Sequence, residues 1–218
     1  MGTILCFGDS NTYGYRPEDG KRYPKEVRWT GILAEKMKKE GNEVIEEGLV
    51  GRTTVFEDSI RPGRKGIDLI QPILESHGPV DQLVLMLGTN DCKSVYNASP
   101  LVIGYGMENI LKQVKKYDPQ IKILLLSPIH LGEHVWKETY DPEFNRKSVY
   151  VSKKLKPIYS GLARKYGCQF LAASDFAKPS FIDQEHLSEE GHKVLAEAIY
   201  RVLSKNYQEI KKEEEKKL

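Results

Sequence analysis

Five short apolar runs recur along the chain, and each is followed by a stretch with the residue spacing of an amphipathic helix. Strands that alternate with helices in this way form βαβ units, which build a parallel sheet with helices on both faces. The third run, DQLVLMLG, is almost entirely apolar, as expected of a strand buried on both faces. The sequence therefore predicts an α/β protein with a five-stranded parallel sheet. We expect the strands at residues 3–8, 42–49, 81–88, 121–128 and 168–174.

The stretches between the apolar runs predict the helices. Apolar side chains recur at helical spacing in the first of them, and Gly41 favours its end. Pro157 is expected to kink or divide the fourth helix. The chain shows no internal repeat and no linker-like stretch, so we expect one domain over residues 1–208, followed by a charged, solvated tail at 209–218. The helices are expected at residues 28–41, 66–78, 101–118, 148–167 and 188–208.

Composition argues against several classes of partner. A hydrophobic content of 39% and a net charge of +2 describe a globular chain without a large excess of either charge. Bulk electrostatics therefore give no indication of a nucleic-acid partner. No apolar stretch approaches the roughly 18–20 residues of a membrane span, and the first residues lack the apolar core of a signal peptide. We expect neither a nucleic-acid nor a membrane partner.

The cysteines indicate a reducing compartment. There are three, Cys6, Cys92 and Cys168, and an odd number of widely spaced cysteines is neither a disulfide framework nor a CxxC metal site. Cys6 and Cys168 fall in predicted strands, where free thiols pack as small apolar side chains. The sequence therefore predicts a cytoplasmic protein.

Glycines and short polar residues follow the ends of the predicted strands. Ligands of open parallel sheets bind outside the carboxyl ends of the strands, so these residues mark a candidate site. They are Gly8-Asp9-Ser10 after the first strand, Gly48 to Arg52 after the second, Gly88 to Asp91 after the third, Ser127 to His130 after the fourth, and Asp183 to His186 beyond the fifth.

The residue types at this edge fit ester hydrolysis. Ser10 can serve as a helix cap, but a serine can also be a nucleophile when a base removes its proton. His186 suits that role near neutral pH, and Asp183, three residues earlier, can orient the imidazole. The backbone N–H groups of Ser10 and Gly51 and the side-chain amide of Asn90 can hold an oxyanion. These are the parts of a serine esterase.

The segments FGDSNTYG, GLVGRTT, LGTND and DQEHLSEEGH resemble the four sequence blocks of the SGNH (GDSL) hydrolases. The letters S, G, N and H correspond to Ser10, Gly51, Asn90 and His186, and the blocks span residues 7–192 in the right order. The segments RWTGIL, VIEEGLVGRTT and LMLGTNDCK are similar to the arylesterase/acyltransferase branch, which also includes carbohydrate acetylesterases. One departure is Gln184, where a glycine is common.

The resemblance implies a three-layer α/β/α flavodoxin-like sandwich and a Ser10-His186-Asp183 triad that needs no metal or other cofactor. We expect hydrolysis of small carboxylic esters through an acyl-enzyme, with acyl transfer if an alcohol competes with water. One alternative is an acetylesterase that deacetylates sugars. A noncatalytic carbohydrate- or partner-binding domain on the same fold is an alternative of another class. The chain has no G-x-S-x-G elbow and none of the glycine-rich motifs of nucleotide-binding proteins.

Several residues near the site have competing interpretations. Asp9 is expected to organise the turn, Arg52 to bind an anionic substrate or form an ion pair, and His192 to be structural. His130 and His134 have the spacing of metal ligands, but we expect no metal site there. Cys92 is expected to line the pocket. Further pocket walls are expected from Tyr13, Tyr15, Ile129, Leu131 and Trp136, and subunit contacts of a homo-oligomer from Tyr15, Trp29 and Trp136.

Overall fold

The computed structural model describes residues 2–204, which form a sheet of five parallel strands in the order β2-β1-β3-β4-β5. The register pairs Gly8 at the end of β1 with Gly48 of β2 and Met86 of β3, so these three strands end level with one another. The sheet confirms the predicted α/β class and strand number. The strands are β1 (Gly2–Gly8), β2 (Asn42–Gly48), β3 (Gln82–Met86), β4 (Lys122–Ser127) and β5 (Gln169–Ala172).

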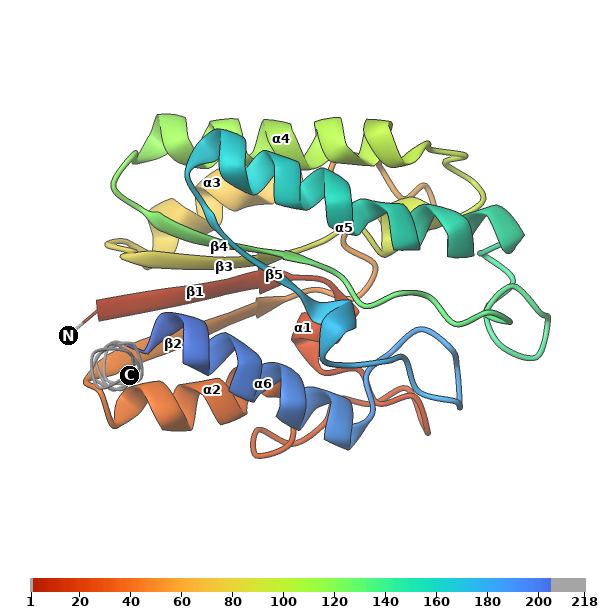
Figure 1. Cartoon of the computed structure of the whole chain (residues 1–218), viewed down its shortest axis with the longest axis horizontal. Helices are drawn as coiled ribbons and strands as arrows, with labels where there is room; N and C mark the ends of the chain where they lie inside the picture. Colours follow the sequence, from red (N-terminus) through yellow and green to blue (C-terminus); the bar gives the residue numbers. More distant parts are fainter. Residues whose placement is uncertain (1, 205–218) are drawn as a thin grey trace, which may run out of the picture.

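Helices cover both faces of the sheet, which gives the three layers of a flavodoxin-like sandwich (Figure 1). Helices α3, α4 and α5 lie on one face, whereas α2 and α6 lie on the other (Figure 1). The longer helices are α2 (Trp29–Lys38), α3 (Gly66–His77), α4 (Pro100–Tyr117), α5 (Arg146–Tyr166) and α6 (Glu189–Leu203). The short ones are α1 (Ser10–Tyr13), η1 (Asn90–Cys92) and η2 (Ala173–Asp175).

Successive residues of the central strands enter different cores. In β1, Leu5 and Phe7 pack in the core beneath α3, α4 and α5, whereas Ile4 and Cys6 pack in the core with α2 and α6. All four side chains are at most 1% exposed. This two-sided burial explains why the strands read as continuous apolar runs rather than as alternating patterns.

Three predicted elements differ from the observed ones. Helix α5 continues through Pro157, which lies on the exposed side of the helix, where water can satisfy the carbonyl group left without its usual donor. The predicted fifth strand ends early, because η2 begins at Ala173. Helix α6 ends at Leu203, where Ser204 adopts an extended conformation, so the helix expected to reach residue 208 is too long; the tail at 209–218 lies outside the described residues.

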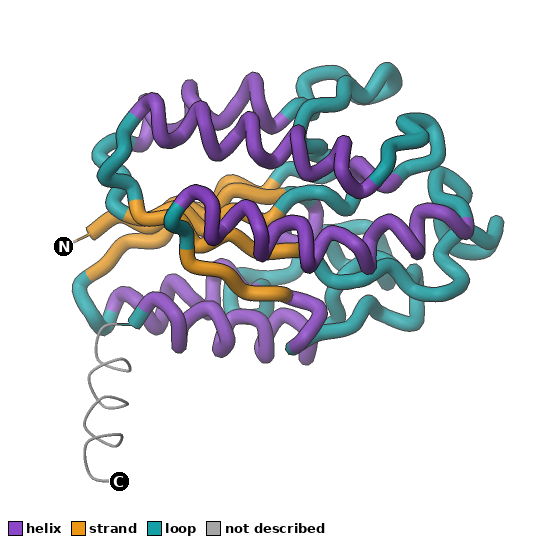
Figure 2. Tube along the Cα trace, turned by 45° about the horizontal axis from the view of Figure 1, so that its top comes forward, coloured by secondary structure: helices purple, strands orange, loops and turns teal. Residues whose placement is uncertain are grey.

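The strand order creates a crevice at the carboxyl ends of β1 and β3. The chain leaves β1 towards β2 on one side, and β3 continues towards β4 and β5 on the other, so the connections diverge between these two strands. Long loops gather beyond the carboxyl ends of the strands, on the side away from the N-terminus (Figure 2). Within residues 2–204, no helix combines the length and apolar character needed to cross a bilayer.

Candidate active site

Ser10 lies at a tight junction between β1 and α1. Asp9 caps α1, because its Oδ1 accepts a hydrogen bond from the backbone N–H of Asn11 at 3.0 Å. Asp9 therefore organises the turn, as predicted, and the capping role weighed for Ser10 belongs to Asp9. A Cβ atom on Gly8 would lie 2.0 Å from Oγ1 of Thr12, so the chain requires a glycine where the strand turns into the helix.

The side chains of Ser10, His186 and Asp183 form one hydrogen-bonded chain. Oγ of Ser10 lies 2.9 Å from Nε2 of His186, and Nδ1 of His186 lies 2.6 Å from Oδ2 of Asp183. When Nδ1 carries the ring proton and donates a hydrogen bond to Asp183, Nε2 presents its lone pair to the serine hydroxyl. The structure thus brings together three predicted site residues, with Ser10 and His186 separated by 176 positions in the sequence.

The loop before α6 holds Asp183 and His186 in one turn. Oδ1 of Asp183 accepts hydrogen bonds from the backbone N–H groups of Glu185 and His186, each at 3.0 Å. Gln184 has a φ of 65°, in the left-handed region that favours glycine. Its backbone oxygen accepts a hydrogen bond from Gly132 at 2.8 Å. The turn therefore forms with glutamine at the position where glycine is common.

Asn11 ties this loop to the helix that carries Ser10. Its Oδ1 accepts a hydrogen bond from the backbone N–H of Leu187 at 2.9 Å, and its Nδ2 lies 3.5 Å from the carbonyl oxygen of Glu185. Its own carbonyl oxygen accepts a hydrogen bond from Nε1 of Trp29 at 3.0 Å. Asn11 is 2% exposed, so these contacts fix the two halves of the site in a buried setting.

Neighbouring carboxylates shift the protonation of the histidine. Burial by itself lowers the pKa of His186, but the negative charges of Glu185 and Asp183 outweigh it and hold this pKa above its ordinary value. Burial would raise the pKa of Asp183, but its hydrogen bonds with His186 and the backbone keep that pKa below the ordinary range. The pair is therefore set to stabilise an imidazolium ion.

The three residues expected to supply an oxyanion hole, Ser10, Gly51 and Asn90, line the same cleft. No described residue accepts a hydrogen bond from the backbone N–H of Ser10 or Gly51, so both donors are available to a ligand. Gly51 has a φ of 82°, which again favours glycine. Asn90 is 3% exposed, and its Nδ2 donates to the carbonyl oxygen of Arg52 at 3.1 Å, which leaves the second amide hydrogen for a ligand.

Arg52 serves the backbone rather than a ligand. Its Nη1 donates to the carbonyl oxygen of Gly8 at 2.8 Å and to that of Glu47, and its guanidinium stacks on the ring of Phe7 at 4.0 Å. The side chain is buried, and it makes no ion pair with a described carboxylate. The expected ion pair of Arg52 is therefore wrong, because its Nη1 donates to carbonyl groups where β1 and β2 end.

A cleft of about 360 Å³ opens over these groups. Tyr15 covers one face of the imidazole of His186, with ring centroids 4.2 Å apart. A larger hollow of about 510 Å³ lies at the opposite edge of the sheet, around residues such as Asp81 and Lys122, far from Ser10. The lining of the cleft is mostly polar and includes Ser10, Tyr15, Gly51, Arg61, Asn90, Lys93, Thr139, Tyr140, Asp141, Glu143, Ile182, Asp183, Glu185 and His186.

Of the predicted aromatic and apolar walls, the cleft contains only Tyr15. Ile129 and Leu131 are core residues, each 3% exposed. Cys92 was expected at the pocket but lies in the core, where burial holds its pKa well above the ordinary value. The remaining misplaced residues are Tyr13, stacked with Arg22, and Trp136, stacked with Arg146 at a separate groove.

Two predictions about neighbouring residues have clear outcomes. Trp29 is fully buried, so it cannot lie in a subunit contact. His192 is structural, as predicted, because its Nδ1 accepts a hydrogen bond from the backbone N–H of Trp29 at 3.2 Å. Burial lowers the pKa of His192 to about 3, which keeps the ring neutral. Among residues 2–204, no group of three potential ligands that includes His130 or His134 is placed to hold a metal ion.

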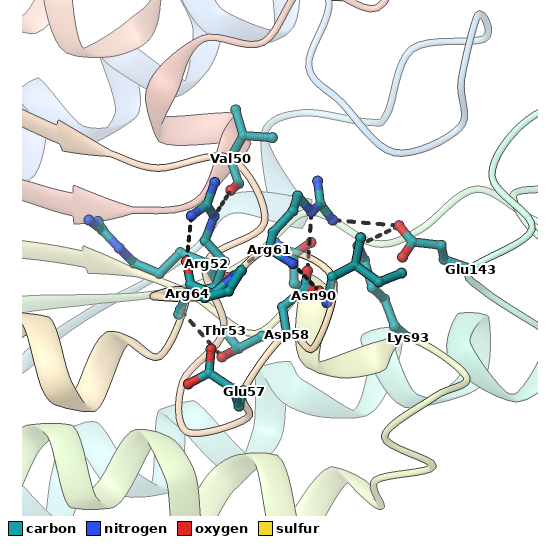
Figure 3. Close-up of polar contacts among 12 residues, drawn as sticks. Val50, Arg52, Thr53, Glu57, Asp58, Arg61, Arg64, Asn90, Lys93 and Glu143 are labelled. Atoms are coloured by element: carbon teal, nitrogen blue, oxygen red, sulfur yellow. Dashed lines mark hydrogen bonds and ion pairs between the residues drawn. The ribbon is translucent and has the colours of Figure 1, made fainter.

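Sequence reasoning missed a charged cluster at the cleft. Glu143 forms ion pairs with both Lys93 and Arg61 (Figure 3), with its Oε2 at 2.6 Å from Nζ of Lys93 and 3.7 Å from Nη2 of Arg61. The order of the strands does not place the loop of residues 139–143, which brings Glu143 to the cleft. Glu185 was also missed, although its position directly before His186 was a usable signal.

The sequence profile of the GDSL-like lipase/acylhydrolase family matches residues 6–194, which include every residue of the hydrogen-bonded chain. The chain belongs to this family. The match confirms the predicted resemblance to the SGNH hydrolases and shows that this protein is a carboxylic-ester hydrolase. Among curated proteins, none is significantly similar to it in sequence.

Several solved structures are similar to this one. An aryl esterase from Mycobacterium smegmatis is 32% identical with a TM-score of 0.84, and a carbohydrate acetylesterase from Sinorhizobium meliloti is 34% identical with a TM-score of 0.85. Each comparison covers 93% of this chain and 98% of the other. A lipase/acylhydrolase from Enterococcus faecalis, at 18% identity and a TM-score of 0.65, shares the fold; it covers 93% of this chain and 95% of that one.

Proposed function

We propose that this protein is a serine esterase in which Ser10 is the nucleophile, His186 the general base and Asp183 the residue that orients His186. The observation that supports this most directly is the hydrogen-bonded chain from Oγ of Ser10 through the imidazole to the carboxylate of Asp183. Its distances are already those required for proton transfer, without any rearrangement.

The proposed reaction begins when Oγ of Ser10 attacks the ester carbonyl and Nε2 of His186 takes the hydroxyl proton. The carbonyl oxygen becomes an oxyanion, which the N–H groups of Ser10, Gly51 and Asn90 stabilise. The tetrahedral intermediate then breaks its bond to the alcohol oxygen, which takes the proton from His186. Water repeats the same steps on the acyl-enzyme, with His186 as base and then acid, and releases the carboxylic acid and free Ser10.

Small esters are the proposed substrates. The cleft volume of about 360 Å³ accommodates a short acyl chain and a small alcohol rather than a lipid. Aryl esters are one proposed class, in line with the similarity to an aryl esterase. Acetylated sugars are a second, favoured by the polar lining of the cleft and the similarity to a carbohydrate acetylesterase.

Acyl transfer is proposed as a side reaction of the same intermediate. An alcohol that enters the cleft in place of water would accept the acyl group from Ser10 and give a new ester. The ratio of new ester to free acid in the presence of a short alcohol measures this reaction. Release of free acid alone, at every alcohol concentration, would contradict acyl transfer without contradicting hydrolysis.

A serine-directed phosphonate tests the proposed nucleophile. An esterase of this design forms a covalent adduct at Ser10, which intact-mass and peptide analysis locate, and the Ser10→Ala variant stays unlabelled. A noncatalytic binding domain on the same fold would remain unlabelled in the wild type as well. Hydrolysis rates for aryl acetates, longer aryl esters and acetylated sugars, compared as kcat/KM, then rank the two substrate classes.

Two further proposals concern the setting of the enzyme. We place it in the cytoplasm, because Cys6, Cys92 and Cys168 are all free thiols and two of them are buried. We also propose a homo-oligomer whose loops narrow the entrance of the cleft. Light scattering at micromolar concentration tests this, and a single species of 24.9 kDa would exclude the oligomer.

A further inference from the structure

Glu185 turns a carboxyl group towards the cleft, and no donor in the described part of the chain pairs with it. The residue is 6% exposed, and it lines the cleft beside Ser10 and His186. Within residues 2–204, no N–H or O–H group donates a hydrogen bond to either of its carboxylate oxygens. Its Oε2 lies 3.9 Å from Nδ1 of His186, but that nitrogen already forms a hydrogen bond with Asp183.

The charged groups around Glu185 are engaged elsewhere. Lys93 also acts on its charge, but Nζ of Lys93 is held by Glu143 at 2.6 Å. Asp141 and Asp183 add negative charge on the same side. Burial is the main reason why the pKa of Glu185 rises to about 7; the charge of His186 opposes this rise, and the carboxylates of Asp141 and Asp183 add to it.

A carboxyl group in this state favours a particular kind of ligand. Its oxygens are open to the cleft, so a ligand that displaces water from them loses free energy unless it supplies a hydrogen-bond donor in place of the water. Asp141 and Asp183 oppose an anionic ligand. The donor that a small neutral ester or an acetylated sugar carries is a hydroxyl group.

We propose that the carboxyl group of Glu185 accepts a hydrogen bond from a hydroxyl group of the substrate, so that the enzyme prefers small esters with a free hydroxyl beside the ester bond. This inference rests on the proposed esterase function and names its substrate class. Glu185 is then a specificity-determining residue, because an ester without the hydroxyl leaves its carboxyl group unpaired in the closed complex.

Isosteric ester pairs test the proposal. Hydroxyethyl acetate is compared with propyl acetate for a hydroxyl in the alcohol part, and ethyl glycolate with ethyl propanoate for a hydroxyl in the acyl part. The measured quantity is the ratio of kcat/KM within each pair, for the wild type, Glu185→Gln and Glu185→Leu. Glu138→Leu is the matched control, because Glu138 is exposed and has no polar partner in the described part of the chain.

We expect the wild type to favour the hydroxylated member of at least one pair. Glu185→Leu should lower that ratio roughly 10- to 100-fold, because the loss falls on the hydroxylated member. Glu185→Gln should keep much of the preference, since an amide oxygen still accepts a hydrogen bond. Glu138→Leu should leave the ratio unchanged.

Three outcomes would overturn the proposal. One is a wild-type ratio near unity in both pairs, which needs no variant and is independent of folding. Another is an unchanged ratio in a folded Glu185→Leu protein. The third is a fall in kcat/KM that is equal for both members of a pair and equal in Glu185→Leu and Glu185→Gln. Such a result would mean that Glu185 acts only through the effect of its charge on His186. The proposed function fails separately, if Ser10→Ala still hydrolyses either member.

Discussion

The phenol ring of Tyr15 lies over one face of the imidazole of His186, with the centroids 4.2 Å apart and the planes tilted by 31°. Tyr15 follows the one-turn helix that begins at Ser10, so the same short segment supplies the serine and a cover for the histidine. The ring limits both the rotation of the imidazole and its contact with water. The orientation of His186 therefore depends on Tyr15 as well as on Asp183.

Replacement of this ring should slow the reaction modestly. A ring–ring contact contributes about 0.5–1.5 kcal/mol, so Tyr15→Ala should lower kcat roughly 3- to 10-fold. Tyr15→Phe keeps the ring and should retain most of the activity. Steady-state kinetics on the two variants separate packing from the phenol hydroxyl, and equal losses in both would assign the effect to the hydroxyl.

The hydrogen-bonded chain should behave as one unit. Ser10→Ala, His186→Ala and Asp183→Asn should each fold and lose at least roughly 10³-fold in kcat. The double variant Ser10→Ala/His186→Ala should be little worse than either single variant, because each change alone disables the same step. Turnover of Ser10→Ala near the wild-type rate would show that another group is the nucleophile.

Asn90 should act mainly on the transition state. If its free amide hydrogen binds the oxyanion, Asn90→Ala should lower kcat roughly 10²- to 10³-fold with little change in KM. Its other contact, from Nδ2 to the carbonyl oxygen of Arg52, is structural. A merely structural role would lower the unfolding temperature and disturb KM and kcat together, so thermal unfolding on the same preparation discriminates the two.

The pH profile should report the carboxylates around His186. The imidazole is faced by Asp183 and Glu185 of its own loop and by Asp9 at the end of β1, and these charges hold its pKa above 6.5. Since the base must be neutral, kcat/KM should rise with pH to a midpoint above 6.5. Glu185→Gln removes a negative charge and should move the midpoint to lower pH. A wild-type midpoint below 6.5 would contradict this account.

His192 should make the fold sensitive to acid. Its pKa falls from 6.5 to about 3 on folding, so the unfolded chain binds the proton more readily. This contribution to stability is complete above pH 6.5 and is lost as the pH falls towards 3, by at most about 1.4 kcal/mol per pH unit. Urea unfolding of the wild type and of His192→Asn across this range should show a difference that shrinks with falling pH. A constant difference would count against a neutral, buried His192.

The strands and the position of the site were predictable because each rests on local composition. Continuous apolar runs identify strands buried on both faces, and glycines with short polar residues mark their carboxyl ends. The one-turn helix α1 is too short to show a helical period, and Pro157 obscured the continuity of α5. Neither the presence of α1 nor the continuity of α5 through Pro157 can be inferred from the residue pattern of a single sequence.

The walls of the cleft were less predictable, because they come from irregular loops. Ile129 and Leu131 follow a buried strand and were expected at the pocket, but the chain turns them into the core instead. Lys93 and Glu143 are 50 positions apart in the sequence, and no pattern in either segment predicts their contact. The environment of Glu185 depends on such contacts, which is why its significance emerges only in three dimensions.

The hydrogen bonds between Asn11 and the loop before α6 have a consequence for how the protein is synthesised. Asn11 leaves the ribosome early, but its partner Leu187 lies 176 positions later, just before the last described helix. Domains are synthesised from the N-terminus, so the serine is in place long before the histidine exists. A chain interrupted before Asp183 therefore carries the nucleophile without its base. Hydrolytic activity should therefore appear only when the last part of the chain has been translated and has folded onto the rest of the domain.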